Sequence, residues 1–305
     1  MSLGGDEYVL SHGDYTAVVT EVGGGLRLFR QGDRDLILGY AADEVRPRYR
    51  GALLAPWPNR VVDGRYSFGG ESYQLDLSEP ERGHALHGLV AWSRFDLLDS
   101  DSSSAVLGHP IVPRTGYPFC VVVTVRYSLD DRGLSCSVTA RNTGDRPAPY
   151  GVASHPYLLG GSGRVDDWVL ELPASEVLEV TPDRLVPTGT RSVADTDFDY
   201  RSPRLVGRTE LDHAFTSLSP DARGLVRARV LAQDGTGVEC EWVAAELPWV
   251  QVHTADLPDA SESRRGLALE PMSCPPDAFN SGTDLVVLEP GAEHTVDWTL
   301  RAVTP

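Results

Sequence analysis

Lysine is absent from the 305-residue sequence, so all 27 residues counted as Lys or Arg are arginines. Its absence excludes the mechanisms that need a lysine amine, including Schiff-base formation, pyridoxal phosphate attachment and the phosphate-binding lysine of nucleotide-binding loops. The 4 cysteines are scattered and none belongs to a Cys-x-x-Cys pair, so the sequence gives no support to a zinc ribbon or a thioredoxin-like redox site.

Long apolar runs are also missing. No stretch approaches the roughly 18 residues that a membrane-spanning helix needs. The first ten residues, MSLGGDEYVL, lack the basic flank and apolar core of a signal peptide. We therefore expect a cytoplasmic protein without a membrane partner. The formal net charge of −17 argues against nucleic-acid partners, because these bind to basic patches.

Helical periodicity is weak, and strand-like segments prevail. No segment of about 12 or more residues keeps a 3.6-residue apolar period. Instead, alternating or β-branched runs are separated by turns, and the sequence contains 30 Gly and 22 Pro. The runs are 15–22 and 26–29, the arms of 65–75 around Gly69-Gly70, 119–129 and 134–142, 225–232 and 237–243, and 285–288 and 295–303. Because no linker or repeat interrupts this pattern, it predicts an all-β protein with one large β-sandwich domain over residues 1–305.

The segment LLAPWPNRVVDGR, residues 53–65, combines rigid and hydrogen-bonding groups. Trp57 stands between two prolines, and the proline after it favours an extended backbone there. Asn59 and Arg60 follow, and the guanidinium of Arg60 is a fork of donors suited to vicinal hydroxyls or carboxylates. Two interpretations remain open for this segment, a binding surface or a loop whose arginine pairs with a structural carboxylate.

Three histidines lie in segments that can carry chemistry. His84 and His87, in GHALHG, have a His-x-x-His spacing, but no third ligand stands nearby, so the indication of a metal site is weak. A histidine beside a glycine more often makes one fixed hydrogen bond in a tight turn. His155 precedes a proline at the end of an apolar strand, where a lone histidine is usually a core residue with its hydrogen bonds satisfied.

Two acidic residues also stand out. Asp212 precedes His213 in a segment that looks buried, and Glu270 ends a run of small and apolar residues before a proline-rich loop. Burying a carboxylate is costly unless the group is paired or functional. Ends of strands that lead into loops are common places for catalytic groups.

In their order along the chain, these segments resemble the aldose 1-epimerase (galactose mutarotase) family. The resemblance covers roughly residue 50 to the end and depends on an ordered set of short motifs. They are Asn59-Arg60, His87-Gly88, His155-Pro156-Tyr157, Asp212 to Phe215, and Glu270 with Pro276-Asp277-Ala278-Phe279-Asn280.

This resemblance implies the large antiparallel β-sandwich of the galactose mutarotase-like superfamily. It implies His155 as general acid and Glu270 as general base, with Arg60, His87 and Asp212 holding the sugar. We add Asn59 and, from its flat ring, Trp57 as expected substrate-binding residues. The implied reaction opens the ring of a small-molecule sugar and recloses it as the other anomer, without a metal or cofactor.

Several alternatives stay open at this point. A glycoside hydrolase would need a second carboxylate flanking the bond, and Asp212 and Asp277 are available beside Glu270. A non-catalytic sugar-binding module would not need both an acid and a base. A mutarotase acting on hexose 6-phosphates would need further arginines near the sugar, and Arg48, Arg50 and Arg82 are present. The sequence is compatible with either a monomer or a homodimer.

Overall fold

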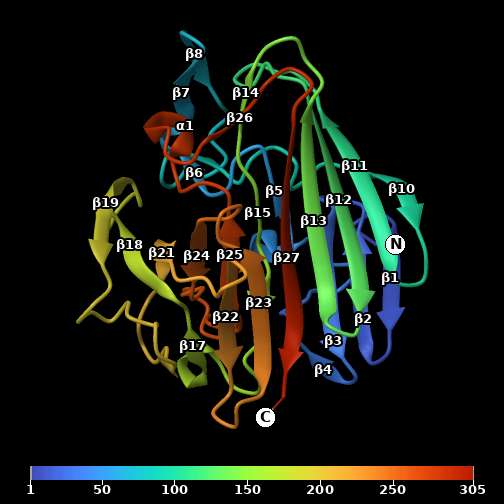
Figure 1. Ribbon diagram of the computed structural model, residues 1–305, viewed down its shortest axis with the longest axis vertical. Coiled ribbons are helices and arrows are strands. Elements are labelled where there is room, and N and C mark those ends of the chain that lie inside the picture. The colour runs from blue at the N-terminus through green and yellow to red at the C-terminus, as the bar shows by residue number, and fades with distance from the viewer. Residues whose placement is uncertain (1, 305) are drawn as a thin grey trace.

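The computed structural model describes residues 2–304 and contains two large sheets whose strands pair antiparallel. Strands hold 49% of the residues and helices 4%, which confirms the predicted all-β class. Apolar side chains from both sheets meet in one core cluster, so the sheets form a sandwich. In Figure 1, β22, β23 and β27 lie at the front, and β24 and β25 lie behind them.

The larger sheet has nine strands. In spatial order they are β10 (Asp96–Ser100), β11 (Ser104–Ile111), β12 (Val121–Asp130), β13 (Gly133–Asn142), β27 (Glu293–Val303), β23 (Gly237–Val243), β22 (Leu225–Leu231), β17 (Val169–Glu171) and β20 (Arg204–Leu205). Burial alternates along β12, β13 and β22, as expected for strands with one face on the core and the other toward solvent.

The second sheet has eight strands and carries most of the polar residues discussed below. Its spatial order is β19 (Pro187–Ser192), β18 (Ala174–Val180), β21 (Asp212–Leu218), β24 (Trp249–His253), β25 (Leu267–Met272), β15 (Ala153–Ser154) and β5 (Leu53–Leu54), and β16 (Tyr157–Leu158) also pairs with β25. All six residues of β25 are buried, so this strand is covered on both faces.

Smaller sheets and short helices complete the chain. A four-stranded sheet contains β1 (Glu7–His12), β2 (Tyr15–Thr20), β3 (Gly25–Gln31) and β4 (Arg34–Asp35). Three strand pairs are β14 (Ala148–Tyr150) with β26 (Val286–Leu288), β6 (Arg60–Val61) with β9 (Ala85–Leu86), and β7 (Arg65–Phe68) with β8 (Glu71–Gln74). The helical segments are η1 (Pro47–Tyr49), η2 (Val62–Gly64), η3 (Val165–Asp167) and α1 (Ala278–Ser281).

The strand pairs expected from short turns are confirmed. The arms around Gly69-Gly70 are β7 and β8, and the two longer pairs are β12 with β13 and β22 with β23. The last two predicted strands, β26 and β27, both form but do not pair with each other. Instead, β26 pairs with β14, and β27 lies between β13 and β23.

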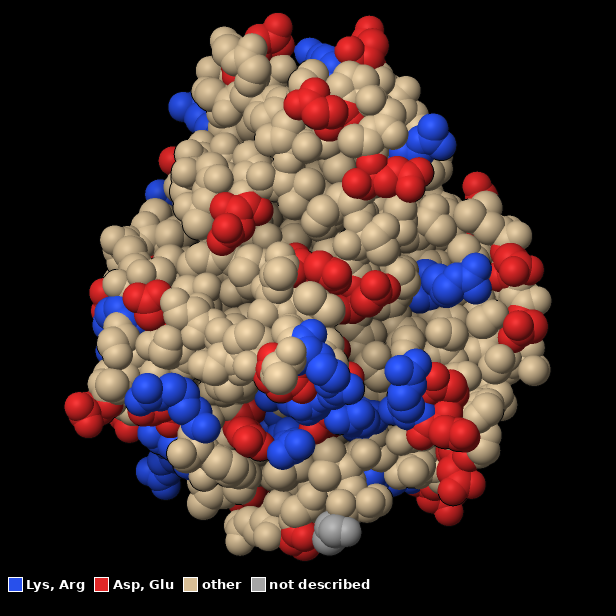
Figure 2. Space-filling view, in the orientation of Figure 1, with Lys and Arg blue, Asp and Glu red and all other residues tan. Residues whose placement is uncertain are grey.

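Arginine and acidic side chains gather together over β22, β23 and β27 on the face shown in Figure 2. Glu239 on β23 is only 2% exposed, and it pairs with Arg229 at 2.6 Å and also with Arg301. Within residues 2–304, no helix combines the length and the apolar character that crossing a bilayer requires.

Candidate active site

The register of three neighbouring strands brings polar side chains together. Asp212 at the start of β21 lies opposite His253 on β24, and Gln251, two residues earlier on β24, lies opposite Glu270 on β25. Because alternate residues of a strand share one face, Gln251 and His253 point the same way. The amide of Gln251 donates to Asp212 Oδ1 at 2.7 Å, which joins the two ends of this row.

His155 reaches the same row from the other side of β25. On β15, Ala153 pairs with Met272, and on β16, Tyr157 pairs with Ala268. The residue midway between these two pairs is His155, and its partner position on β25 is Glu270. The His-Pro step interrupts the ladder between β15 and β16, and the imidazole Nε2 lies 3.4 Å from Glu270 Oε1.

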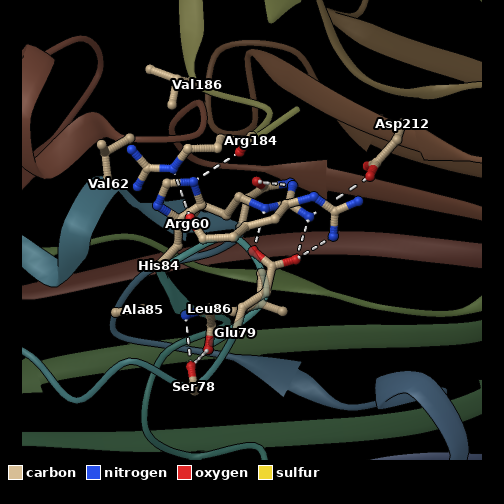
Figure 3. A network of polar contacts seen from close by, with 12 residues as sticks. Arg60, Val62, Ser78, Glu79, His84, Ala85, Leu86, Arg184, Val186 and Asp212 are labelled. Atoms are coloured by element: carbon tan, nitrogen blue, oxygen red, sulfur yellow. Dashed lines mark hydrogen bonds and ion pairs between the residues drawn. The ribbon is translucent and has the colours of Figure 1, made fainter. Parts of the chain in front are cut away.

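Arg60 lies between two carboxylates, as Figure 3 shows. Its Nε and Nη2 donate to the two oxygens of Glu79 at 2.8 and 2.9 Å, and Nη2 is 3.7 Å from Asp212 Oδ2. Its Nη1 donates to Asn59 Oδ1 at 3.3 Å. Arg60 is 7% exposed, so this bidentate pair is fixed and largely shielded from water.

His87 is positioned by a turn that requires left-handed backbone. Its φ is 61°, and its N–H donates to the carbonyl of Asn59, whose φ is 53°. Gly88 follows with φ of 72°, and a Cβ there would lie 2.2 Å from the carbonyl oxygen of Ala55. Only glycine fits this close approach, so Gly88 fixes the ring of His87, whose centroid is 5.2 Å from that of His155.

These side chains line a cavity of about 250 Å³. Six of the seven residues expected from the sequence line it: Asn59, Arg60, His87, His155, Asp212 and Glu270. Within residues 2–304, five buried polar atoms of this lining have no hydrogen-bond partner, namely Arg82 Nε, His87 Nδ1, His155 Nδ1, Gln251 Oε1 and Glu270 Oε2. Buried polar groups are rarely left unpaired, so this arrangement suits a small ligand rich in hydroxyl groups.

Burial shifts the pKa values of Glu270 and His155 in opposite directions. It raises the pKa of Glu270 well above its usual range, with a further rise from the charge of Asp212 against the opposing effect of Arg60. It lowers the pKa of His155 to about 3, and His253 adds to that effect. Because a buried charge is disfavoured on either partner, these shifts favour a protonated Glu270 beside a neutral His155.

The carboxylates around Arg60 stay ionised. Burial by itself would raise the pKa of Asp212, but the charges of His253 and Arg60 and the hydrogen bond from Gln251 lower it. Burial likewise opposes ionisation of Glu79, and the hydrogen bonds and charge of Arg60 overcome that effect and lower its pKa. The polar side of the cavity thus has fixed charges and fixed donor directions.

Trp57 does not reach this cavity, contrary to the expectation that it binds the sugar. The side chain is 3% exposed and packs in the core beside Phe279, with ring centroids 5.7 Å apart. Its indole N–H donates to the carbonyl of Ala85 at 3.3 Å. The ring is therefore a core group whose faces are covered by protein.

The two histidines of the His-x-x-His segment have different environments. His84 is buried, with Nδ1 accepting from the N–H of Asp63 at 3.2 Å and Nε2 bonded to the carbonyl of Arg184 at 2.8 Å. Both ring nitrogens of His84 are therefore occupied, and only His87 faces the cavity. The interpretation of His84 as a structural turn residue agrees with these contacts.

Sequence reasoning missed Tyr49, Glu79, Gln251 and His253, which also line the cavity. For Gln251 and His253 a signal was present, because polar residues alternate with apolar ones in the buried run WVQVH. No local pattern marks Glu79, whose partner Arg60 is 19 residues away along the chain.

Comparison with known proteins places the chain in a family. A family model described as aldose 1-epimerase matches residues 6–301. An uncharacterized Escherichia coli protein, YihR, is 35% identical over 296 residues, which cover 96% of this chain and 92% of that protein. The aldose 1-epimerase of Escherichia coli is 27% identical over 300 residues, which cover 86% of this chain and 83% of the relative.

A solved structure shares the fold. The GalM/aldose epimerase homologue from C. elegans superposes with a TM-score of 0.84 at 22% identity, over 98% of this chain and 99% of that chain. The galactose mutarotase-like sandwich that the resemblance implied is therefore confirmed.

Proposed function

The chain belongs to the aldose 1-epimerase family, and we propose that it interconverts the α and β anomers of a hexose such as glucose or galactose. One observation carries this proposal. His155 Nε2 and Glu270 Oε1 lie 3.4 Å apart in the cavity lining. His155 stands between β15 and β16, and Glu270 stands on β25, the strand with which both of them pair. Two groups this close can address the two oxygens that share the anomeric carbon.

The proposed step moves one proton at each oxygen. Glu270 takes the proton of the anomeric hydroxyl as the C1–O1 double bond forms, the C1–O5 bond breaks, and His155 gives a proton to O5. Rotation about C1–C2 and the reverse steps close the ring on the other face. The pair gains and loses one proton, so its total charge is unchanged at every stage.

Sugar binding also prepares the pair for this step. Without a ligand, burial favours the shared proton on Glu270 and neutral His155. Hydroxyl groups that donate to Glu270 Oε2 stabilise the carboxylate, which lowers its pKa and favours transfer of the proton to His155. Meanwhile Arg60 and Asp212, fixed by Glu79 and Gln251, orient the remaining hydroxyls.

The rival functions are less well supported by the same geometry. A hydrolase would pair Glu270 with a second carboxylate. Asp277 accepts from the N–H of Val62 and from Asn280 and does not line the cavity. Asp212 does line it, but its oxygens are engaged, with Oδ1 accepting from Gln251 and Oδ2 lying 3.7 Å from Arg60. The group facing Glu270 is a histidine. A pure binding module would not need this buried acid and base pair, whose burial is unfavourable for folding.

Polarimetry on two variants tests the proposal. Replacing Glu270→Gln should lower kcat by about 10²–10⁴-fold, the usual contribution of one acid or base. The matched control is Glu246→Gln, because burial also raises the pKa of Glu246 but the residue lies outside the cavity. Near-normal turnover by the Glu270 variant, or sugar binding without anomer interconversion by the wild type, would contradict the proposal.

Arg48 favours a second candidate substrate, a hexose with a phosphate or another anionic group. Arg48 and Arg82 both line the cavity, whereas Arg50 turns away to the carbonyl of Gly39. Arg82 is already paired with Glu79 at 2.9 Å, but Arg48 forms no ion pair with any residue in the range 2–304. Turnover of glucose, galactose and glucose 6-phosphate by the wild type and by Arg48→Gln distinguishes the two. If Arg48→Gln loses turnover of glucose 6-phosphate alone, this candidate is supported. If the wild type does not turn over glucose 6-phosphate, the anionic group of the substrate is not a phosphate.

A further inference from the structure

Trp92 is the exception among the tryptophans. The other five are at most 5% exposed, whereas Trp92 is 53% exposed: the buried ones are Trp57, Trp168, Trp242, Trp249 and Trp298. A large ring left in water, next to a cavity lined by polar groups, is a common feature of a surface that binds something.

The ring of Trp92 is held in place by a buried arginine. The guanidinium of Arg46 lies over it, 5.4 Å from the ring centroid. Arg46 is 6% exposed, and its nitrogens donate to the carbonyl of Ala91 at 2.8 Å, to Tyr40 Oη at 3.3 Å and to the carbonyl of Val22. Because Arg46 is fixed in this way, the platform exists before any ligand arrives.

The segment that carries Trp92 is also tied to the rest of the fold. The N–H of Leu89 donates to the carbonyl of Ala55 at 2.7 Å, and the carbonyl of Ser93 accepts from the N–H of Gly23 at 2.7 Å. Little conformational freedom is therefore lost when a ligand binds, which favours affinity.

A row of rings connects Trp92 with the reactive pair. The centroid of Tyr49 is 5.8 Å from Trp92 and 4.6 Å from His87, and His87 is 5.2 Å from His155. Tyr49 has a left-handed φ of 57°, a strained conformation for a tyrosine that holds its ring between the cavity and Trp92. Aromatic rings thus run in sequence from His155 through His87 and Tyr49 to Trp92.

The cavity itself has room for little more than one sugar ring. Its volume of about 250 Å³ is below the range of about 300–1,000 Å³ usual for ligand pockets. Trp92 does not line it, so a group that touches Trp92 must extend out of the cavity.

We propose that Trp92 and Tyr49 form an outer subsite that stacks on the second sugar ring of a reducing disaccharide whose reducing-end hexose occupies the cavity. This inference rests on the proposed anomer interconversion. One face of a pyranose carries C–H groups and is apolar, so it fits the free face of an indole, while the reducing-end ring keeps its hydroxyls on Arg60 and Asp212.

The test compares kcat/KM for a disaccharide, maltose or lactose, with kcat/KM for glucose and galactose. Trp92→Ala should lower the disaccharide to monosaccharide ratio by about three- to tenfold, the range expected for loss of one aromatic stacking contact. Trp92→Phe should restore most of the ratio. The control is Leu98→Ala, an exposed apolar residue on β10 outside the cavity, which should leave the ratio unchanged. An unchanged ratio in Trp92→Ala would overturn the proposal.

Two further measurements test the outer subsite independently of turnover and of self-association. Tryptophan fluorescence of the Glu270→Gln variant should change saturably with maltose, and this change should be absent from Glu270→Gln/Trp92→Phe, so the subsite can be tested even if the wild type interconverts no anomers. Sedimentation of wild type and Trp92→Ala tests whether a second copy of the chain covers this ring instead. A dimer that dissociates in the variant, with no change in the substrate ratio, would overturn the subsite.

Discussion

At the scale of single residues, the buried pair His155 and Glu270 shares one proton between groups that both resist charge. Burial lowers the pKa of His155 to about 3 and raises that of Glu270 well above its usual range. A histidine of ordinary pKa would be partly protonated near neutrality. The cavity instead favours a single proton shared by His155 and Glu270. An acid and a base that act together need one proton between them.

This environment predicts a pH-dependent stability difference for His155→Asn. Unfolded His155 binds a proton below about pH 6.5, whereas folded His155 does so only near pH 3. The wild type therefore loses stability from this group as the pH falls from about 6.5 toward 3, and the variant does not. The unfolding free energy of the variant relative to wild type should rise by about 1.4 kcal/mol per pH unit in that window.

Denaturant unfolding of both proteins at pH 7.5, 6.5, 5.5 and 4.5 measures this difference. Effects of the substitution that do not involve titration are the same at each pH and cancel in the slope. A difference that stays constant below pH 6.5 would show that His155 titrates normally in the folded protein.

The sequence was most informative where burial and chemistry conflict at one position. Glu270 could be singled out because a carboxylate in an apolar strand is expensive. For Trp57 and Trp92 the sequence gives no comparable signal, because both stand in segments rich in proline, glycine or small residues. Only the fold decides which of the two rings faces solvent. Trp57 is 3% exposed and Trp92 is 53% exposed.

At the scale of elements, the site is a consequence of strand register. Glu270 on β25 lies opposite Gln251 on one side and level with His155 on the other. A shift of one residue in either pairing would turn these side chains to the opposite face of the sheet. The loop between β9 and β10 has the same importance, because it carries both His87 and Trp92.

We expect Gly88→Ala to disrupt that loop. The new Cβ would lie 2.2 Å from the carbonyl oxygen of Ala55, at a φ of 72°, so the backbone of the turn must move and His87 moves with it. Activity should fall by at least about tenfold, and stability should fall by more than the roughly 1–2 kcal/mol that a left-handed alanine costs.

Gly69→Ala is the matched control for this prediction. Gly69 has a φ of 61° in the β7–β8 turn, but a Cβ there has no neighbour within 4 Å. It should show the conformational penalty alone, with normal polarimetric activity. Equal thermal stabilities of the two variants, with activity retained in both, would contradict the role given to Gly88.

Local signals in the sequence predicted where strands form better than they predicted which strands pair. The β7–β8, β12–β13 and β22–β23 pairs were predictable because a short turn joins the two strands. The strands β26 and β27 were also predicted, but their partners β14, β13 and β23 lie far away in the chain. Which of these pairings forms depends on the packing of the whole sandwich, and turn chemistry carries no information about it.

At the scale of the whole molecule, acidic groups outnumber arginines widely, with 44 Asp and Glu against 27 Arg. Many arginines are already engaged, as in the pairs of Arg227 and Arg229 with acidic residues of β23. The excess negative charges repel one another across the surface, and this repulsion opposes the compact state.

Moderate salt should therefore stabilise the protein. Raising NaCl from about 10 mM to about 200 mM shortens the Debye length from about 30 Å to below 10 Å, which screens long-range repulsion more than short ion pairs. The melting temperature should rise by a few degrees, and kcat/KM for a neutral sugar should change less than twofold, because a neutral ligand is not steered by the field. Thermal melts and polarimetry across this range check both parts. A melting temperature that falls with salt would show that the ion pairs, rather than the excess of 17 negative charges, dominate the electrostatic free energy of folding.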